Sequence, residues 1–148
     1  MKKTISFNNT PAVNLTQQAL SAWVYECVEE RGGKIKRLVI NFITEDEMLN
    51  LNQKYLKHDT HTDILTFCYN DQSRIESEIF ICFDRARENA KAHSETIENE
   101  ILRLISHGLL HNFGLNDSTK ALRETMTKEE NRLMRMFHVK HTSSEKAL

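Results

Sequence analysis

The chain has 148 residues, of which 39% are hydrophobic and 28% charged, a balance typical of one globular domain with a sizeable core. Its formal net charge of −1 provides no global basic field, which argues against tight, non-specific binding of nucleic acid. The first ten residues lack an apolar stretch and no run approaches ~18 apolar residues, so the sequence predicts neither a signal peptide nor a membrane span.

The first half of the chain shows two strand patterns and two helix patterns. Short runs of branched apolar residues indicate the strands, and apolar residues three or four apart indicate the helices. Gly32 and Gly33 end the first helix, and a capping box of Thr44 and Glu47 opens the second. The expected elements are a strand over residues 5–7, a helix over 15–30, a strand over 37–43 and a helix over 44–56.

The second half shows two strands and then three helices. A polar, turn-like segment separates the two strands, which predicts an antiparallel hairpin. Asp84 is expected to cap the first of these helices, and a second capping box, Thr127 with Glu130, is expected to open the last. The expected elements are strands over residues 64–69 and 78–83 and helices over 84–93, 95–113 and 127–137.

This order predicts a single domain of α+β (mixed) architecture over residues 1–140, with one mixed sheet of about four strands packed against about five helices. Residues 141–148 are expected to form a flexible tail. The three cysteines, Cys27, Cys68 and Cys82, are sparse and form no CxxC pair. We therefore expect reduced thiols in a cytosolic protein, buried as small apolar side chains.

The stretch HGLLHNFGLND, residues 107–117, predicts a metal site. His107 and His111 are four apart in a helical segment, so both imidazoles lie on one face and suit one tetrahedral ion. Gly114 can end the helix and turn the chain back, which brings Asp117 toward the same ion. Two imidazoles and one carboxylate leave a fourth position for water, as in catalytic sites. The alternative is a pair of buried histidines that only form hydrogen bonds.

The same stretch is similar to the helix of zinc peptidases of the zincin type, HExxHxxGxxH or D. In that pattern the glutamate after the first histidine is the general base. Here that position is Gly108, so such a peptidase would lack its base. Bound zinc lowers the pKa of its water to about 7, so hydroxide is accessible at neutral pH. The sequence therefore favours metal-assisted hydrolysis over the usual peptidase mechanism.

Residues 107–117 also resemble the signature H-G-x-L-H-x-x-G-x-D-H of the YbeY endoribonucleases, or rRNA maturation factors. The resemblance implies a single-strand-specific, metal-dependent endoribonuclease that acts on the 3′ end of small-subunit rRNA and in ribosome quality control. It implies single-stranded RNA and the ribosome as partners, no membrane, no small-molecule cofactor and the bacterial cytoplasm. A second family signature matches Leu51, Asn52, Tyr55 and the segment TDILTF over residues 62–67.

The chain departs from the family pattern at several positions. Asp117 stands at the family's third zinc-binding histidine and Asn116 at its aspartate, so we expect one zinc ion, with iron, manganese or nickel as alternatives. Leu56 stands at an arginine thought to act at the phosphate. His58 is the candidate catalytic residue that would replace this charge, and its other interpretation is a solvated loop histidine. Cys68 replaces a family proline, which we interpret as structural.

Two other functions stay open at this stage. A non-catalytic ribosome-assembly or RNA-binding factor would have a structural metal site, with a fourth protein ligand in the water position. His138 and His141 are the spare donors for such a site. A metallopeptidase is the other function, and Gly108 argues against it.

Overall fold

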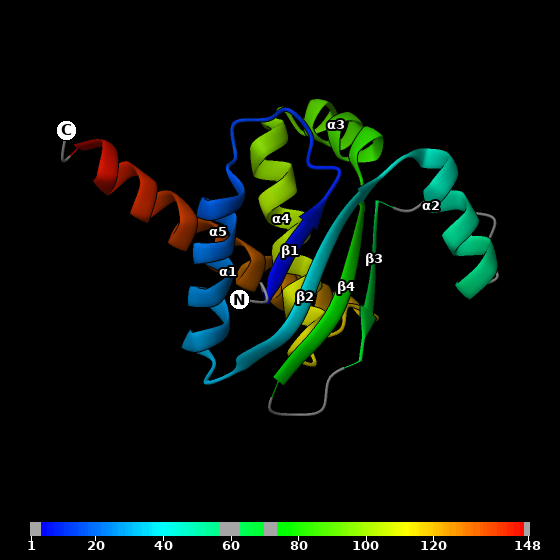
Figure 1. Ribbon diagram of the computed structural model, residues 1–148, viewed down its shortest axis with the longest axis horizontal. Helices are drawn as coiled ribbons and strands as arrows, with labels where there is room; N and C mark the ends of the chain where they lie inside the picture. The colour runs from blue at the N-terminus through cyan, green and yellow to red at the C-terminus, as the bar shows by residue number, and fades with distance from the viewer. Residues whose placement is uncertain (1–3, 57–62, 70–73, 147–148) are drawn as a thin grey trace.

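The computed structural model describes residues 4–56, 63–69 and 74–146, with Leu56 and residues 141–146 described by backbone alone. One four-stranded sheet has the order β1-β2-β4-β3 (Figure 1). β1 pairs with β2, and β2 with β4, in parallel, whereas β3 and β4 pair antiparallel as the hairpin prediction requires. The strands are β1 (Ile5–Asn8), β2 (Lys34–Ile43), β3 (Ile64–Cys68) and β4 (Arg74–Cys82).

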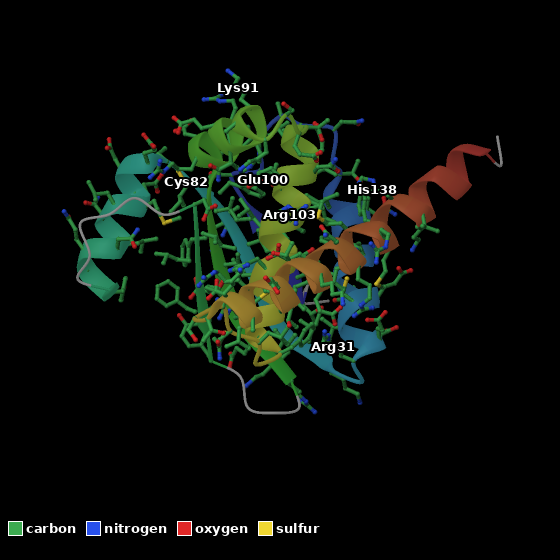
Figure 2. All side chains as sticks on the ribbon, turned by 180° about the vertical axis from the view of Figure 1, so that it is seen from behind. Arg31, Cys82, Lys91, Glu100, Arg103 and His138 are labelled. Carbon is green, nitrogen blue, oxygen red and sulfur yellow. The ribbon has the colours of Figure 1, made fainter. Side chains whose placement is uncertain are left out.

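In the described part of the chain, five α-helices and one π-helical turn accompany the sheet, so the predicted α+β (mixed) architecture is confirmed. Figure 2, seen from behind, shows α4 against the sheet and α5 crossing over α4. The Trp23 indole Nε1 on α1 donates a hydrogen bond to the Leu133 carbonyl on α5, 2.8 Å away, which joins those two helices. The helices are α1 (Gln17–Glu30), α2 (Glu45–Leu51), the turn η1 (Asn52–Leu56), α3 (Phe83–Ala92), α4 (Ile97–Asn112) and α5 (Lys120–Lys146).

α4 is the central helix of the fold. Its Thr96 cap accepts a hydrogen bond from the Asn99 backbone N–H at 3.0 Å, which fixes where the helix begins. Apolar side chains surround most of its circumference, a pattern typical of a helix buried on several sides. Leu102, Ile105 and Leu109 are fully buried in the main core cluster. The carboxyl end of α4 is therefore held in place by packing before any ligand binds.

The start of α5 differs from the prediction. The helix begins at Lys120, where the Thr119 hydroxyl accepts a hydrogen bond from the Leu122 backbone N–H at 3.1 Å. Thr127 lies inside this helix, so the predicted second capping box is wrong. The helix also continues to Lys146, past the predicted end at residue 137. The domain limits at 1–140 and the flexibility of residues 141–148 stay predictions.

Two smaller predictions are also wrong. Asp84 does not cap α3, because the helix begins at Phe83 and the Asp84 carboxylate pairs with Arg87 at 3.0 Å. Cys68 is exposed at the end of β3, an edge strand with one pairing partner, whereas Cys27 and Cys82 are buried as expected. Among the described residues, no helix is both long enough and apolar enough to cross a membrane.

Candidate metal centre

The last two turns of α4 bring two imidazoles together. His107 and His111 lie one turn apart, and their ring centroids are 4.5 Å from each other. Their Nε2 atoms are separated by 2.9 Å. Both side chains are partly buried, with 21% and 29% of the side-chain surface exposed, so a ligand from solvent can reach them.

The turn after α4 returns the chain to these histidines. Gly114 adopts φ +95°, a left-handed conformation that favours glycine. Its N–H donates to the His111 carbonyl at 3.0 Å, and the Leu115 N–H donates to the Leu110 carbonyl at 3.0 Å. These two bonds make a Schellman motif, which satisfies the last carbonyls of the helix. The predicted helix end at Gly114 is thereby explained by backbone geometry.

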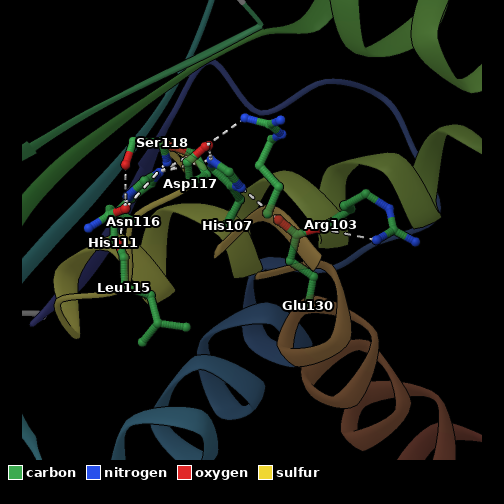
Figure 3. Close-up of polar contacts among 9 residues, drawn as sticks. Arg103, His107, His111, Leu115, Asn116, Asp117, Ser118 and Glu130 are labelled. Carbon is green, nitrogen blue, oxygen red and sulfur yellow. Dashed lines mark hydrogen bonds and ion pairs between the residues drawn. The ribbon is translucent and has the colours of Figure 1, made fainter. Parts of the chain in front are cut away.

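Asp117 follows this turn and faces both imidazoles (Figure 3). Its Oδ2 lies 3.5 Å from His107 Nε2 and 4.0 Å from His111 Nε2. The ligand atoms of the three residues all lie within 4.8 Å of one another. The loop is shaped by Asn116, whose Oδ1 accepts hydrogen bonds from the Ser118 N–H and hydroxyl. The structure therefore brings together all three residues that the sequence predicts as metal ligands.

The other ring nitrogen of each histidine contacts a group that can only accept. His107 Nδ1 donates to Glu130 Oε2 at 2.6 Å, and His111 Nδ1 donates to the Leu115 carbonyl at 3.0 Å. In the neutral rings the proton is thus on Nδ1, which leaves an unprotonated Nε2 on each ring, and the two Nε2 atoms lie 2.9 Å apart and 3.5 and 4.0 Å from Asp117 Oδ2. Three electron-pair donors facing one place repel each other unless a cation lies between them. This donor set fits a transition metal ion.

The charges around His107 favour a cation. Burial lowers the pKa of His107, but the hydrogen bond and charge of Glu130, with the charges of Asp117 and Asp63, outweigh it, and the pKa is raised above its ordinary value. The same carboxylates would attract a metal ion. A metal must displace the proton from the imidazole, so binding is expected to strengthen as the pH rises.

Gly108 has a structural explanation. It is buried against the sheet, and a Cβ atom there would lie 2.8 Å from Ile79 Cδ1 and 3.2 Å from Thr66 Oγ1. Its α-carbon therefore faces β3 and β4 and leaves no room for a glutamate side chain. The position that holds the base in zinc peptidases is thus closed by packing, which agrees with the sequence argument against that mechanism.

The remaining predicted donors lie elsewhere. The exposed His138 donates from Nε2 to Asn99 Oδ1 at 2.7 Å and does not join the three-residue cluster. His58, the predicted catalytic residue, and the side chains of Leu56 and His141 lie outside the described part of the chain.

Glu130 is the site residue that the sequence argument misses. It is 6% exposed and lies on the face of α5 that also buries Met126, Leu133 and Phe137. The sequence signal for Glu130 is an acidic residue within that apolar stripe, because a buried carboxylate requires a polar partner. If Thr127 and Glu130 form a capping box, Glu130 lies in the first turn of a helix and needs no partner from another element. That interpretation is wrong because α5 begins at Lys120.

A cleft of about 570 Å³ opens beside His107. It lies between the start of β3, the end of α3, and one side of α4 and α5. Glu100 and Arg103, labelled in Figure 2, project from α4 into this region. Burial and the nearby charge of Asp63 raise the pKa of the Glu100 carboxyl. The cleft provides space for a substrate next to the predicted ligands.

A helix that presents two imidazoles and a following carboxylate to one ion, beside an open cleft, is characteristic of metal-dependent hydrolases. The family described as Endoribonuclease YbeY matches residues 3–138. The chain therefore belongs to the YbeY family, as its signature residues predict.

Individual relatives agree with this assignment. The chain is 36% identical to "Endoribonuclease YbeY" of Parabacteroides distasonis over 124 residues, which cover 84% of this chain and 86% of that protein. It is 33% identical to the protein of the same name from Flavobacterium johnsoniae, covering 91% and 98% of the two chains. The solution structure of TM1509 from Thermotoga maritima is similar with a TM-score of 0.66 and 26% identity, covering 92% of this chain and 93% of that one.

Proposed function

We propose that this protein is a metal-dependent endoribonuclease that cleaves single-stranded RNA. Family membership supports the chemistry, since the matching relatives are named endoribonucleases. The observation that carries the proposal is the convergence of His107, His111 and Asp117, with both Nδ1 atoms already engaged. Such a site can hold an ion and keep a position for water or a phosphoryl oxygen.

The residues of the site would divide the work between binding and orientation. His107 and His111 would bind the ion through Nε2, and Asp117 through its carboxylate. The Leu115 carbonyl orients the His111 ring. When bound, the ion supplies Lewis-acid polarisation of a phosphoryl oxygen and a more acidic water. We propose zinc, with iron, manganese or nickel as alternatives, because two imidazoles and a carboxylate accept each of them.

The substrate and cellular role follow from the family resemblance. We propose maturation of the 3′ end of small-subunit rRNA and ribosome quality control, in the bacterial cytoplasm and with the ribosome as partner. His58 is proposed to offset negative charge at the phosphate, in place of the family arginine that is Leu56 here. Neither a small-molecule cofactor nor a membrane belongs to this proposal.

The non-catalytic alternative is less well supported. It requires a fourth protein ligand in the water position, and His138 bonds to Asn99 instead. Within the described ranges, the group of residues that could hold an ion has three members.

Metal content and RNA cleavage, measured on the same preparations, test the proposal. The wild type should hold one transition metal ion per chain and cleave a single-stranded RNA oligonucleotide. His111→Ala should lose both properties, whereas His138→Ala, the matched control on an exposed histidine, should keep both. Wild-type protein that takes up no metal after zinc addition, or His111→Ala protein that cleaves at the wild-type rate, would falsify the proposal.

A further inference from the structure

We propose that Glu130 on α5 is a positioning residue for the metal, which it controls through His107. The inference rests on the proposed metal site. It adds to the three proposed ligands a fourth side chain that contacts one of them, and this side chain comes from α5, a helix that contributes no ligand. Glu130 lies 23 residues after His107 in the sequence, and its Oε2 accepts a hydrogen bond from His107 Nδ1 at 2.6 Å.

Both oxygens of the Glu130 carboxylate have partners. Oε2 contacts His107, and Oε1 accepts from Arg103 Nη1 at 3.2 Å (Figure 3). Arg103 and His107 are one turn apart on α4, so the carboxylate lies across two consecutive turns of that helix. The side chain is 8% exposed, which restricts its rotation and shields the contact from solvent. A buried carboxylate held at both oxygens gives the imidazole one preferred orientation.

The helix that bears Glu130 is itself anchored on both sides of this residue. Arg132 pairs with Glu30 on α1 at 2.6 Å, and Glu129 pairs with Arg31 at 3.0 Å. The apolar side chains of Met126, Leu133 and Phe137 are buried in the core. The backbone at Glu130 therefore has little freedom to follow a displaced histidine, and the orientation of His107 is imposed by α5.

Two consequences for the ion follow from this contact. The hydrogen bond fixes the proton on Nδ1, so that Nε2 faces His111 and Asp117 with a free lone pair. The negative charge of Glu130 also makes the Nε2 atom a stronger electron-pair donor. Removal of such a partner of a ligating histidine costs about 10- to 100-fold in metal affinity.

A competition titration with a chromophoric zinc chelator tests the role without recourse to catalysis. Glu130→Ala should bind zinc about 10- to 100-fold more weakly than the wild type. Glu130→Gln keeps an oxygen that can accept from Nδ1 and should lose less. Glu124→Gln is the matched control, because Glu124 is an exposed acid on α5 that belongs to neither of the ion pairs that anchor the helix, and its zinc affinity should be that of the wild type.

The fold of each variant is checked by circular dichroism of the metal-free protein. Glu130→Ala should fold, because Arg103 is 34% exposed and can turn to solvent when its partner is lost. If it does not fold, Glu130→Gln carries the test, with a measurable loss of zinc affinity as the expected result.

Histidine side-chain nitrogen NMR of the zinc-loaded protein supplies a second measurement. The wild type should show His107 with its proton on Nδ1, in slow exchange with water, and Glu130→Ala should show this proton exchanging faster. A wild type that binds no zinc refutes the metal site itself. A wild type that binds zinc, together with Glu130 variants of unchanged affinity, refutes the positioning role alone.

Discussion

Substitution of Gly108 by alanine tests how closely α4 must approach the sheet. The added Cβ would lie 2.8 Å from Ile79 Cδ1 and 3.3 Å from Ile79 Cγ1, and Ile79 is fully buried. Overpacking of this kind costs about 1–3 kcal/mol in unfolding free energy. Alanine regains about 1 kcal/mol over glycine inside a helix. The difference between the two effects is a net loss of up to about 2 kcal/mol, which is smaller the further the Ile79 Cδ1 methyl can turn away from the added atom.

Urea unfolding followed by circular dichroism measures this loss, and a double-mutant cycle with Ile79→Val locates its cause. Ile79→Val alone should cost about 0.5–1.5 kcal/mol, because it removes the buried Cδ1 methyl. In the Gly108→Ala background that methyl is the clashing atom, so its removal should cost less or stabilise the protein. Additive effects of the two substitutions would show that Ile79 does not limit position 108, and the packing explanation for this glycine would be wrong.

The other predictions concern the turn, the third ligand and the cleft. Gly114→Ala should cost about 1–2 kcal/mol of unfolding free energy, since a residue with a side chain is strained at φ +95° although nothing lies within 4 Å of the added Cβ. Urea unfolding measures this loss, and an unchanged midpoint would contradict the explanation that the turn requires glycine. Asp117→Ala should weaken zinc binding by at least about 10-fold, and full affinity in a chelator titration would mean that another residue is the third ligand. The unfolding midpoint of the metal-free protein should change little, because the Asp117 side chain is 42% exposed. Glu100→Gln should stabilise the metal-free protein more at pH 7 than at pH 4. The raised pKa of the Glu100 carboxyl means that the folded state keeps this proton to a higher pH than the unfolded state does, so the wild type loses stability as the pH rises from the unfolded to the folded pKa. Equal effects at the two pH values in urea unfolding would refute this explanation.

Much of the fold could be predicted because its signals are local. The capping box of Thr44 and Glu47 has both of its hydrogen bonds in the structure. The polar segment between β3 and β4 correctly indicated antiparallel pairing. Errors arose where a local pattern had two interpretations, as at Thr127, which matches a capping box but lies within a helix that begins at Lys120. Buried apolar side chains before and after Thr127 extend the helix through it.

In the candidate metal centre, too, local relations could be predicted from the sequence. The four-residue spacing of His107 and His111 places both imidazoles on one helical face wherever that helix lies. The positive φ of Gly114 is a preference of that residue type, and it turns the chain toward Asp117. These relations involve residues within ten positions of each other, so the sequence by itself determined the set of candidate ligands and the direction of the chain after α4.

Tertiary structure alone decided what surrounds those ligands. Glu130 meets His107 because α5 crosses α4, and the angle of that crossing depends on packing among side chains from α1, α4 and α5. The closure of position 108 likewise depends on Ile79, which belongs to a strand placed between β2 and β3 by the sheet order. Contacts of this kind depend on many weak apolar interactions at once, so no short pattern in the sequence encodes them.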